Sequence, residues 1–254
     1  MADASAATNG GGGLELHPLT QFEIKPIVPI EIGGLNLSFT NSALWMVIAV
    51  LIVFGLTVLP TRARGYVPGR VQVVAEMLYD ATANMLHQAT GRDGRPFFPL
   101  AFTLFSFLLV GNLQGMIPGA FTFTSHIVVT FALALAVFIG TTALGFIKHG
   151  THFFSFFMPT GAPLWTAPLL ILIELISYIS RPISLSLRLF ANMLVGHTML
   201  KVLGGFVFAM GAAGIIPLAA QVAVTALEFL IAVLQAYVFA ILSCIYLGDA
   251  LHPH

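Results

Sequence analysis

Five long apolar runs constrain the fold of this chain more than any other feature. They cover about residues 41–60, 97–118, 124–148, 166–201 and 212–248. A helix rises about 1.5 Å per residue, so about 20 apolar residues cross the ~30 Å hydrocarbon core of a bilayer. The sequence therefore predicts an all-α polytopic membrane protein, with about five membrane helices in a single membrane domain at residues 41–254.

Composition excludes a soluble domain. Hydrophobic residues make up 58% of the chain and charged residues 8%, whereas about 25% of a typical soluble domain is charged. The formal net charge is zero and no long basic run occurs, so nucleic-acid binding has no electrostatic basis. The single cysteine, Cys244, has no partner for a disulfide or for a CxxC metal site. We therefore predict no metal and no cofactor.

Two segments outside these runs have their own patterns. Residues 1–40 begin with a Gly-rich polar tail and continue with three scattered prolines, which predicts a tail followed by a segment along the membrane surface. In residues 68–90, apolar side chains recur near a helical period around Glu76 and Asp80. That pattern predicts one amphipathic helix in the membrane interface.

Positive charge gives the predicted orientation. Basic side chains cluster after the first and third runs, at Arg62, Arg64, Arg70, Arg92, Arg95 and Lys148. Lysine and arginine in short loops mark the cytoplasmic side of a membrane, so we expect the N-terminus outside and the C-terminus in the cytoplasm. The last two runs are longer than a perpendicular crossing requires, and we expect two long, antiparallel, strongly tilted helices.

The fourth run carries a stripe of polar side chains. Its members recur at steps of three and four, which places them on one helix face: Glu174, Ser177, Arg181, Ser184, Arg188 and Asn192. Glu174 and Arg188 are fourteen residues apart, about 21 Å of helix. A stripe of that length predicts the wall of an aqueous path into the bilayer. For the serines alone, hydrogen bonding to a neighbouring helix is an equal alternative.

Arg188 is the member of this stripe that packing explains least. An arginine near the middle of a spanning helix costs roughly 2.5–3.5 kcal/mol on insertion scales. Nearby positions within two turns hold no acidic residue. An intramembrane charge of this kind indicates a functional site, and we predict that Arg188 carries the essential charge.

A second polar face lies on the last run. Four side chains share it: Gln221, Thr225, Glu228 and Gln235. His197 lies nine residues after Arg188, about half a turn around the helix, so we expect His197 to meet Glu228 across the helix pair. Two titratable groups in an apolar slab indicate an ion pathway. A purely structural His–Glu pair is the alternative.

One segment resembles a known family signature. Ser186-Leu187-Arg188-Leu189-Phe190-Ala191-Asn192-Met193 resembles the signature of subunit a of F-type ATP synthases. Glu228–Phe239 resembles the last helix of that family, and His17–Ile24 resembles its N-terminal stretch in alphaproteobacterial and mitochondrial members. Family members often have an acid at the position of His197 and a histidine at that of Glu228. This chain resembles a variant with the two exchanged.

The resemblance implies a stator subunit that offers two offset proton half-channels to a ring of c subunits. In that interpretation the outer path contains Glu228, His197, Asn112 and Gln235, the inner path contains Glu174, Ser177, Ser184 and Asn192, and Arg188 separates them. For Asn112, hydrogen bonding to a neighbouring helix is the first interpretation. The implied partners are the c-ring, b-type peripheral stalk subunits and the lipid bilayer. The implied location is a bacterial inner membrane, with the mitochondrial inner membrane second.

No nucleotide site is expected in this chain. The sequence contains neither a Walker-type Gly-rich loop nor a soluble domain, so we predict a non-catalytic subunit whose nucleotide chemistry belongs to its partners. A self-contained ion transporter or channel is the alternative function, and a membrane scaffold is a third. Transporters tend to have repeated halves, whereas the polar stripe occurs once.

Overall fold

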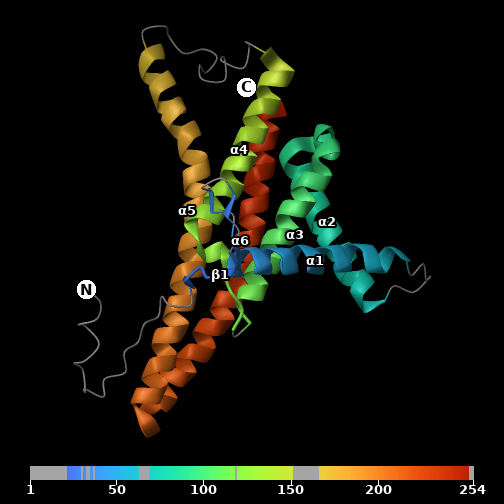
Figure 1. Cartoon of the computed structure of the whole chain (residues 1–254). Coiled ribbons are helices and arrows are strands. Elements are labelled where there is room, and N and C mark those ends of the chain that lie inside the picture. Colours follow the sequence, from blue (N-terminus) through green and yellow to red (C-terminus); the bar gives the residue numbers. More distant parts are fainter. Residues whose placement is uncertain are drawn as a thin grey trace.

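The described part of the chain is almost entirely helical. The computed structural model describes residues 22–29, 31–32, 35–36, 38–62, 69–117, 119–150 and 166–251. Its α-helices, seen in Figure 1, are α1 (Asn41–Arg62), α2 (Arg70–Thr90), α3 (Phe98–Gly115), α4 (Ile127–His149), α5 (Ala167–Ala209) and α6 (Ile215–Leu251). Short 3-10 turns are η2 (Gly91–Phe97), η3 (Phe123–Ser125) and η5 (Gly211–Gly214). Five helical stretches are long and apolar enough to cross a membrane, which confirms the predicted all-α polytopic membrane fold.

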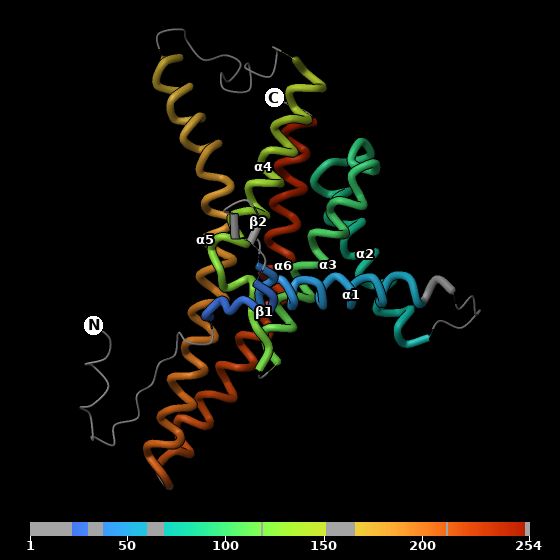
Figure 2. The backbone as a smooth tube through the Cα atoms, in the orientation of Figure 1, coloured from blue at the N-terminus to red at the C-terminus, as the bar shows by residue number. Residues whose placement is uncertain are grey.

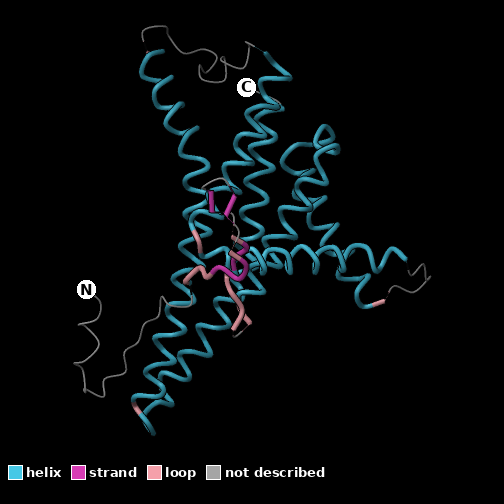
Figure 3. Tube along the Cα trace, viewed as in Figure 1, coloured by secondary structure: helices cyan, strands magenta, loops and turns pink. Residues whose placement is uncertain are grey.

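Short strands precede α1, in the stretch for which the sequence predicted a segment along the membrane surface. The pairs are antiparallel, as Figure 3 shows: β1 (Pro26–Val28) with β4 (Phe39–Thr40), and β2 (Glu31–Ile32) with β3 (Leu35–Asn36). Asn41 ties this segment to the first turn of α1, because its side-chain amide donates to the Glu23 carbonyl at 3.1 Å and its oxygen accepts the Lys25 backbone N–H at 3.2 Å. The first 21 residues of the predicted tail lie outside the described residues.

The main hydrophobic core lies where α5 and α6 pack together and against α3. On α5 it contains Leu185, Leu189 and Met193, and on α6 it contains Ala232 and Ala236. Small alanine side chains let membrane helices approach closely. α6 therefore buries side chains against both α5 and α3, whereas one face of α5 stays exposed.

The turn between these helices differs from its predicted position. The sequence analysis ended one helix at about 201 and began the next at about 212, but α5 continues to Ala209 and the chain reverses at η5. Gly211 has φ +52°, and a Cβ at Gly214 would lie 2.5 Å from the Val207 carbonyl oxygen. Glycine is required at this reversal, whereas the earlier glycines at 204 and 205 fit within α5.

The helices do not share one direction. Figure 2 shows α1 lying across the long helices, which run at a large angle to it. Helices that cross at large angles cannot all follow the membrane normal.

The amphipathic helix α2 passes from an exposed to a buried environment. Its first half exposes Val74 and Met77, whereas its second half buries Met85 and Leu86. α6 approaches the end of α2 closely, since a Cβ at Gly248 would lie 2.5 Å from the Ala89 carbonyl oxygen. The last turns of α2 therefore belong to the packed core.

Candidate functional site

Arg188 lies on the uncovered face of α5. It is exposed, and the ion pairs found among the described residues do not include it. Two apolar residues that precede it on α5, Ile183 and Leu187, are also exposed, at 44% each. α5 thus presents a mostly apolar surface with a single guanidinium on it.

The other members of the α5 stripe follow the same face. Ser177, Ser184 and Asn192 are exposed, and Glu174 is half-buried. The side chains of the opposite face, such as Leu189, are buried in the core. The predicted alignment of these residues along one helix face is thus present.

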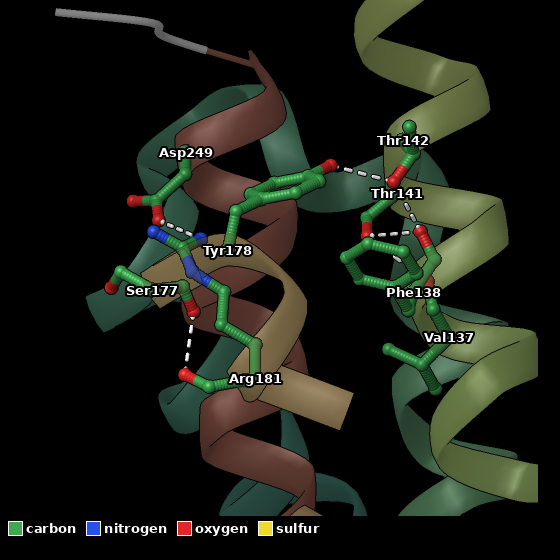
Figure 4. Close-up of polar contacts among 9 residues, drawn as sticks. Val137, Phe138, Thr141, Thr142, Ser177, Tyr178, Arg181 and Asp249 are labelled. Atoms are coloured by element: carbon green, nitrogen blue, oxygen red, sulfur yellow. Dashed lines mark hydrogen bonds and ion pairs between the residues drawn. The ribbon is translucent and has the colours of Figure 1, made fainter. Parts of the chain in front are cut away.

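Arg181 has an environment that the sequence analysis missed. Its Nη1 atom lies 2.8 Å from Oδ2 of Asp249 near the end of α6, and its guanidinium lies between the rings of Tyr178 and Tyr246, 5.4 and 5.1 Å from their centres. Figure 4 shows the Asp249 carboxylate facing this guanidinium, while the Tyr178 hydroxyl meets Thr142 of α4 at 2.6 Å. Arg181 therefore has a charged partner on α6 and aromatic neighbours, and the stripe alone did not indicate them.

His197 and Glu228 meet across α5 and α6, as the helix geometry predicted. Nδ1 of His197 lies 3.2 Å from Oε1 of Glu228, with side-chain exposures of 9% and 2%. The contact is electrostatic rather than an aligned hydrogen bond, because both carboxylate oxygens lack a well-directed donor. On its other side, Nε2 of His197 lies 3.1 Å from the Thr122 hydroxyl. The Thr122 hydroxyl therefore gives the buried pair a polar neighbour from the segment before α4.

Asn112 brings α3 to the same region of α6. Its amide donates to the backbone carbonyl of Ala232 at 3.1 Å, and Ala232 follows Glu228 by one helical turn. The residue is fully buried, and its side-chain oxygen has no hydrogen-bond partner. The donated bond agrees with the packing interpretation of Asn112 and leaves a free acceptor at the contact of α3 with α6, one helical turn from Glu228.

Asn192 and Gln235 form one contact rather than parts of two separate paths. The Asn192 amide donates to the Gln235 side-chain oxygen at 3.0 Å. The family resemblance implied Asn192 for the inner path and Gln235 for the outer path, and this hydrogen bond brings these two residues into direct contact. Asn192 lies one turn from Arg188 on α5, and Gln235 lies two turns from Glu228 on α6. The amide pair therefore lies between the arginine and the buried His–Glu pair.

An open cavity of about 610 Å³ reaches His197. Its polar wall is formed by Thr122, His197, Lys201, Gln221 and Thr225. Gln221 and Thr225 belong to the polar face predicted on α6, so part of that face lines this cavity. We refer to this cavity as the vestibule.

The segment before α4 carries another histidine near this region. His126 stacks on Phe121 with ring centres 5.1 Å apart, and burial lowers the pKa of His126 below its ordinary value of 6.5. Within the described residues, no group of three or more His, Cys, Asp or Glu side chains is arranged to hold a metal ion.

Comparison with known proteins identifies the family. Residues 43–248 match the family model described as ATP synthase A chain. Proteins named ATP synthase subunit a are similar along nearly the whole chain: one from Parvibaculum lavamentivorans is 53% identical over 98% of this chain and 99% of its own length, and one from Rhodospirillum rubrum is 56% identical over 93% and 99%. The relative from Paramagnetospirillum magneticum is 54% identical over 94% and 99%. On this match, the chain belongs to the ATP synthase A chain family.

Proposed function

We propose that this chain is the stationary, non-catalytic proton-conducting subunit of an F-type ATP synthase, with two offset half-channels separated by Arg188. The single observation that carries this proposal is an exposed arginine on an apolar helix face with a buried titratable pair near it. Arg188 lies exposed on an apolar face of α5 without an ion-pair partner among the described residues. A titratable pair, His197 and Glu228, is buried nearby.

We expect the exposed face of α5 to contact a partner subunit. An arginine on an apolar surface is costly against lipid, and a partner with a carboxylate at the same depth would compensate the charge. A ring of c subunits, each with one membrane carboxylate, supplies that group. In a self-contained channel, Arg188 would be buried against other helices of its own chain. The observed exposure of Arg188 therefore gives no support to that alternative.

The outer path begins at the vestibule. Water there reaches His197, which contacts Glu228 at 3.2 Å. From Glu228 the proton passes to a ring carboxylate, and the unpaired oxygen of Asn112 offers an acceptor for a water beside it. A protonated ring carboxylate is neutral and can turn toward the lipid.

The inner path runs along the α5 stripe. A ring carboxylate that arrives at Arg188 meets a guanidinium that stays charged at physiological pH. The positive charge favours the ionised carboxylate, so the proton leaves along Ser184, Ser177 and Glu174. The same fixed charge repels hydronium and prevents a direct leak between the two paths. The Asn192–Gln235 pair lies at the junction and orients the residues around Arg188.

The proposed setting follows from the family and the apolar helices. The chain is a multi-pass protein of a bacterial inner membrane and packs against the c-ring, b-type peripheral stalk subunits and lipid. The basic side chains of Arg70, Arg92 and Arg95 support a cytoplasmic location for the α1–α2 and α2–α3 connections. The N-terminus is then outside and the C-terminus inside.

The proposal is tested by Arg188→Ala in the intact complex. ATP-driven proton pumping in inverted membrane vesicles is expected to be abolished, because a ring carboxylate that arrives at this position then meets no guanidinium. Arg188→Lys should rescue poorly, since an ammonium lacks the planar guanidinium fork and loses its proton more readily when buried. Arg181→Ala is the matched control and should retain partial pumping. Near-normal pumping by an assembled Arg188→Ala complex would contradict the proposal.

A further inference from the structure

Two neighbouring cavities lie on the side of the molecule formed by α1, α2 and α3, away from the proton path. One has a volume of about 710 Å³ and is lined by α2, η2 and the start of α3. The other, of about 370 Å³, lies between α1, α2 and α3. Tyr79 and Phe98 line both, with ring centres 4.7 Å apart. We call them the polar cavity and the apolar groove.

The polar cavity favours an anion. Arg95, His87 and Asn84 line it with nitrogen donors, and its described lining contains no carboxylate. Arg95 lies on η2 and is exposed, so its guanidinium is accessible to a ligand from the membrane surface. A guanidinium binds phosphate oxygens with paired hydrogen bonds.

The apolar groove favours a hydrocarbon chain. Thr57 of α1, Ala75 of α2 and Phe102 of α3 form its wall. The carboxylate of Glu76 at this groove accepts a hydrogen bond from Gln72 at 2.8 Å, so the polar groups there bind each other. Nearby on α2, Val74 and Met77 are exposed at 45% and 67%, which suits contact with lipid.

We propose that α1, α2 and α3 form a binding site for an anionic glycerophospholipid. Its phosphate lies in the polar cavity against Arg95 and His87, and one acyl chain lies in the apolar groove past Tyr79 and Phe98. A phospholipid is the ligand class that carries a phosphate and a long apolar chain in one molecule, and basic pockets between membrane helices recognise such headgroups. A soluble phosphate would leave the groove unused, and a partner helix would leave Arg95 without an anion.

Tryptophan fluorescence of the full-length chain tests the site. Phe102→Trp places a reporter in the groove, in a Trp45→Phe, Trp165→Phe background, and the chain is reconstituted in vesicles that contain dibrominated phosphatidylglycerol or dibrominated phosphatidylcholine. Quenching by the anionic lipid is expected at an about fivefold lower mole fraction, the effect of one arginine near a membrane surface. Arg95→Gln should remove this preference. Arg92→Gln, on the same turn but outside the polar cavity, should keep it.

Four outcomes would overturn the proposal. Equal quenching by both lipids, or an unchanged preference in Arg95→Gln, would exclude headgroup recognition. Loss of the preference in excess glycerol phosphate would identify a soluble phosphate as the ligand. Finally, purified intact complexes of Arg95→Gln should retain less phosphatidylglycerol by mass spectrometry than those of Arg92→Gln, and equal retention would indicate that a partner helix covers the groove. None of these measurements depends on the proton path, so they fail or succeed separately from the proposed function.

Discussion

Gly196 leaves room for the carboxyl group of Glu228. A Cβ at this position would lie 2.7 Å from Oε1 and 2.9 Å from Cδ of Glu228, closer than real Cβ contacts. The absence of a side chain here therefore allows α6 to bring its acid against His197. At the scale of single residues, the buried pair depends on a neighbour that carries no chemistry of its own.

Gly196→Ala is expected to displace Glu228 and reduce proton pumping strongly. Overpacking of this kind typically costs about 1–3 kcal/mol, so the melting temperature of the complex should fall as well. The matched control is Gly140→Ala on α4, where a Cβ would meet nothing within 4 Å. Equal pumping and equal melting temperatures for the two variants would show that the carboxyl group does not need this space.

His197 and Glu228 are expected to act as a coupled pair. His197→Ala and Glu228→Ala should each impair pumping, because removal of one member leaves the other buried without compensation. The exchanged double variant, His197→Glu with Glu228→His, should recover part of the activity, since it restores the contact in the opposite order. Pumping rates of the two single variants and the exchange, in vesicles of defined orientation, measure this coupling. An exchange no better than the worse single variant would leave Glu228 acting alone.

The sequence predicted single residues well where the signal was local. The meeting of His197 and Glu228 follows from helical periodicity and helix pairing, and Arg188 stands out by its position alone. Asp249 was missed as the partner of Arg181 because the two residues are 68 positions apart. Spacing within one helix carries no information about the charge that another helix places opposite.

At the scale of helices, the Arg181–Asp249 contact fastens α5 to the end of α6. The pair is partly buried, with side-chain exposures of 19% and 30%, and two tyrosine rings flank the guanidinium. A charge-assisted hydrogen bond in such a place contributes more than an exposed ion pair. The contact therefore fixes how the last turns of α6 lie against the first half of α5.

Asp249→Asn is expected to lower the free energy of unfolding by about 1–2 kcal/mol. Arg181→Gln should have a similar effect, and the double variant should be less destabilised than the sum of the two, because both remove the same contact. Thermal unfolding of the purified chain in detergent measures the cycle. Asp80→Asn, at an exposed position on α2, is the control. Strict additivity would mean that the two groups do not interact in solution.

Helix ends were harder to predict than helix existence. The apolar length of each run is a local property, so the spans were evident, but α5 extends to Ala209 past two glycines that looked like a turn. The chain reverses instead at Gly211 and Gly214, where the conformation and the Val207 carbonyl require glycine. Glycine is tolerated within membrane helices, so its position alone does not mark a helix end.

At the scale of the whole molecule, the crossing of α1 over the long helices was not predictable from hydropathy. Hydropathy gives the length of a span and not its direction, and direction follows from packing with neighbours. The same limit applies to the vestibule, whose wall combines Thr122 before η3, Lys201 on α5 and Gln221 on α6. Residues so far apart in sequence come together only through the complete arrangement of helices.

The vestibule gives a prediction about the sides of the membrane. In a Cys244→Ser background, Thr225→Cys should react with a membrane-impermeant thiol reagent added outside, because Thr225 lines the vestibule and water there allows the thiol to ionise. Ser184→Cys, on the exposed stripe of α5, should react with reagent added inside.

Val222→Cys is the matched control, since Val222 is 65% exposed on α6 but does not line the vestibule, and a thiol facing lipid should stay unreactive. Modification of Thr225→Cys should also block pumping, because a bulky group there closes the route to His197. Reaction of Thr225→Cys only from the inside would reverse the proposed orientation, and reaction equal to that of Val222→Cys would mean that the vestibule does not hold water in the membrane.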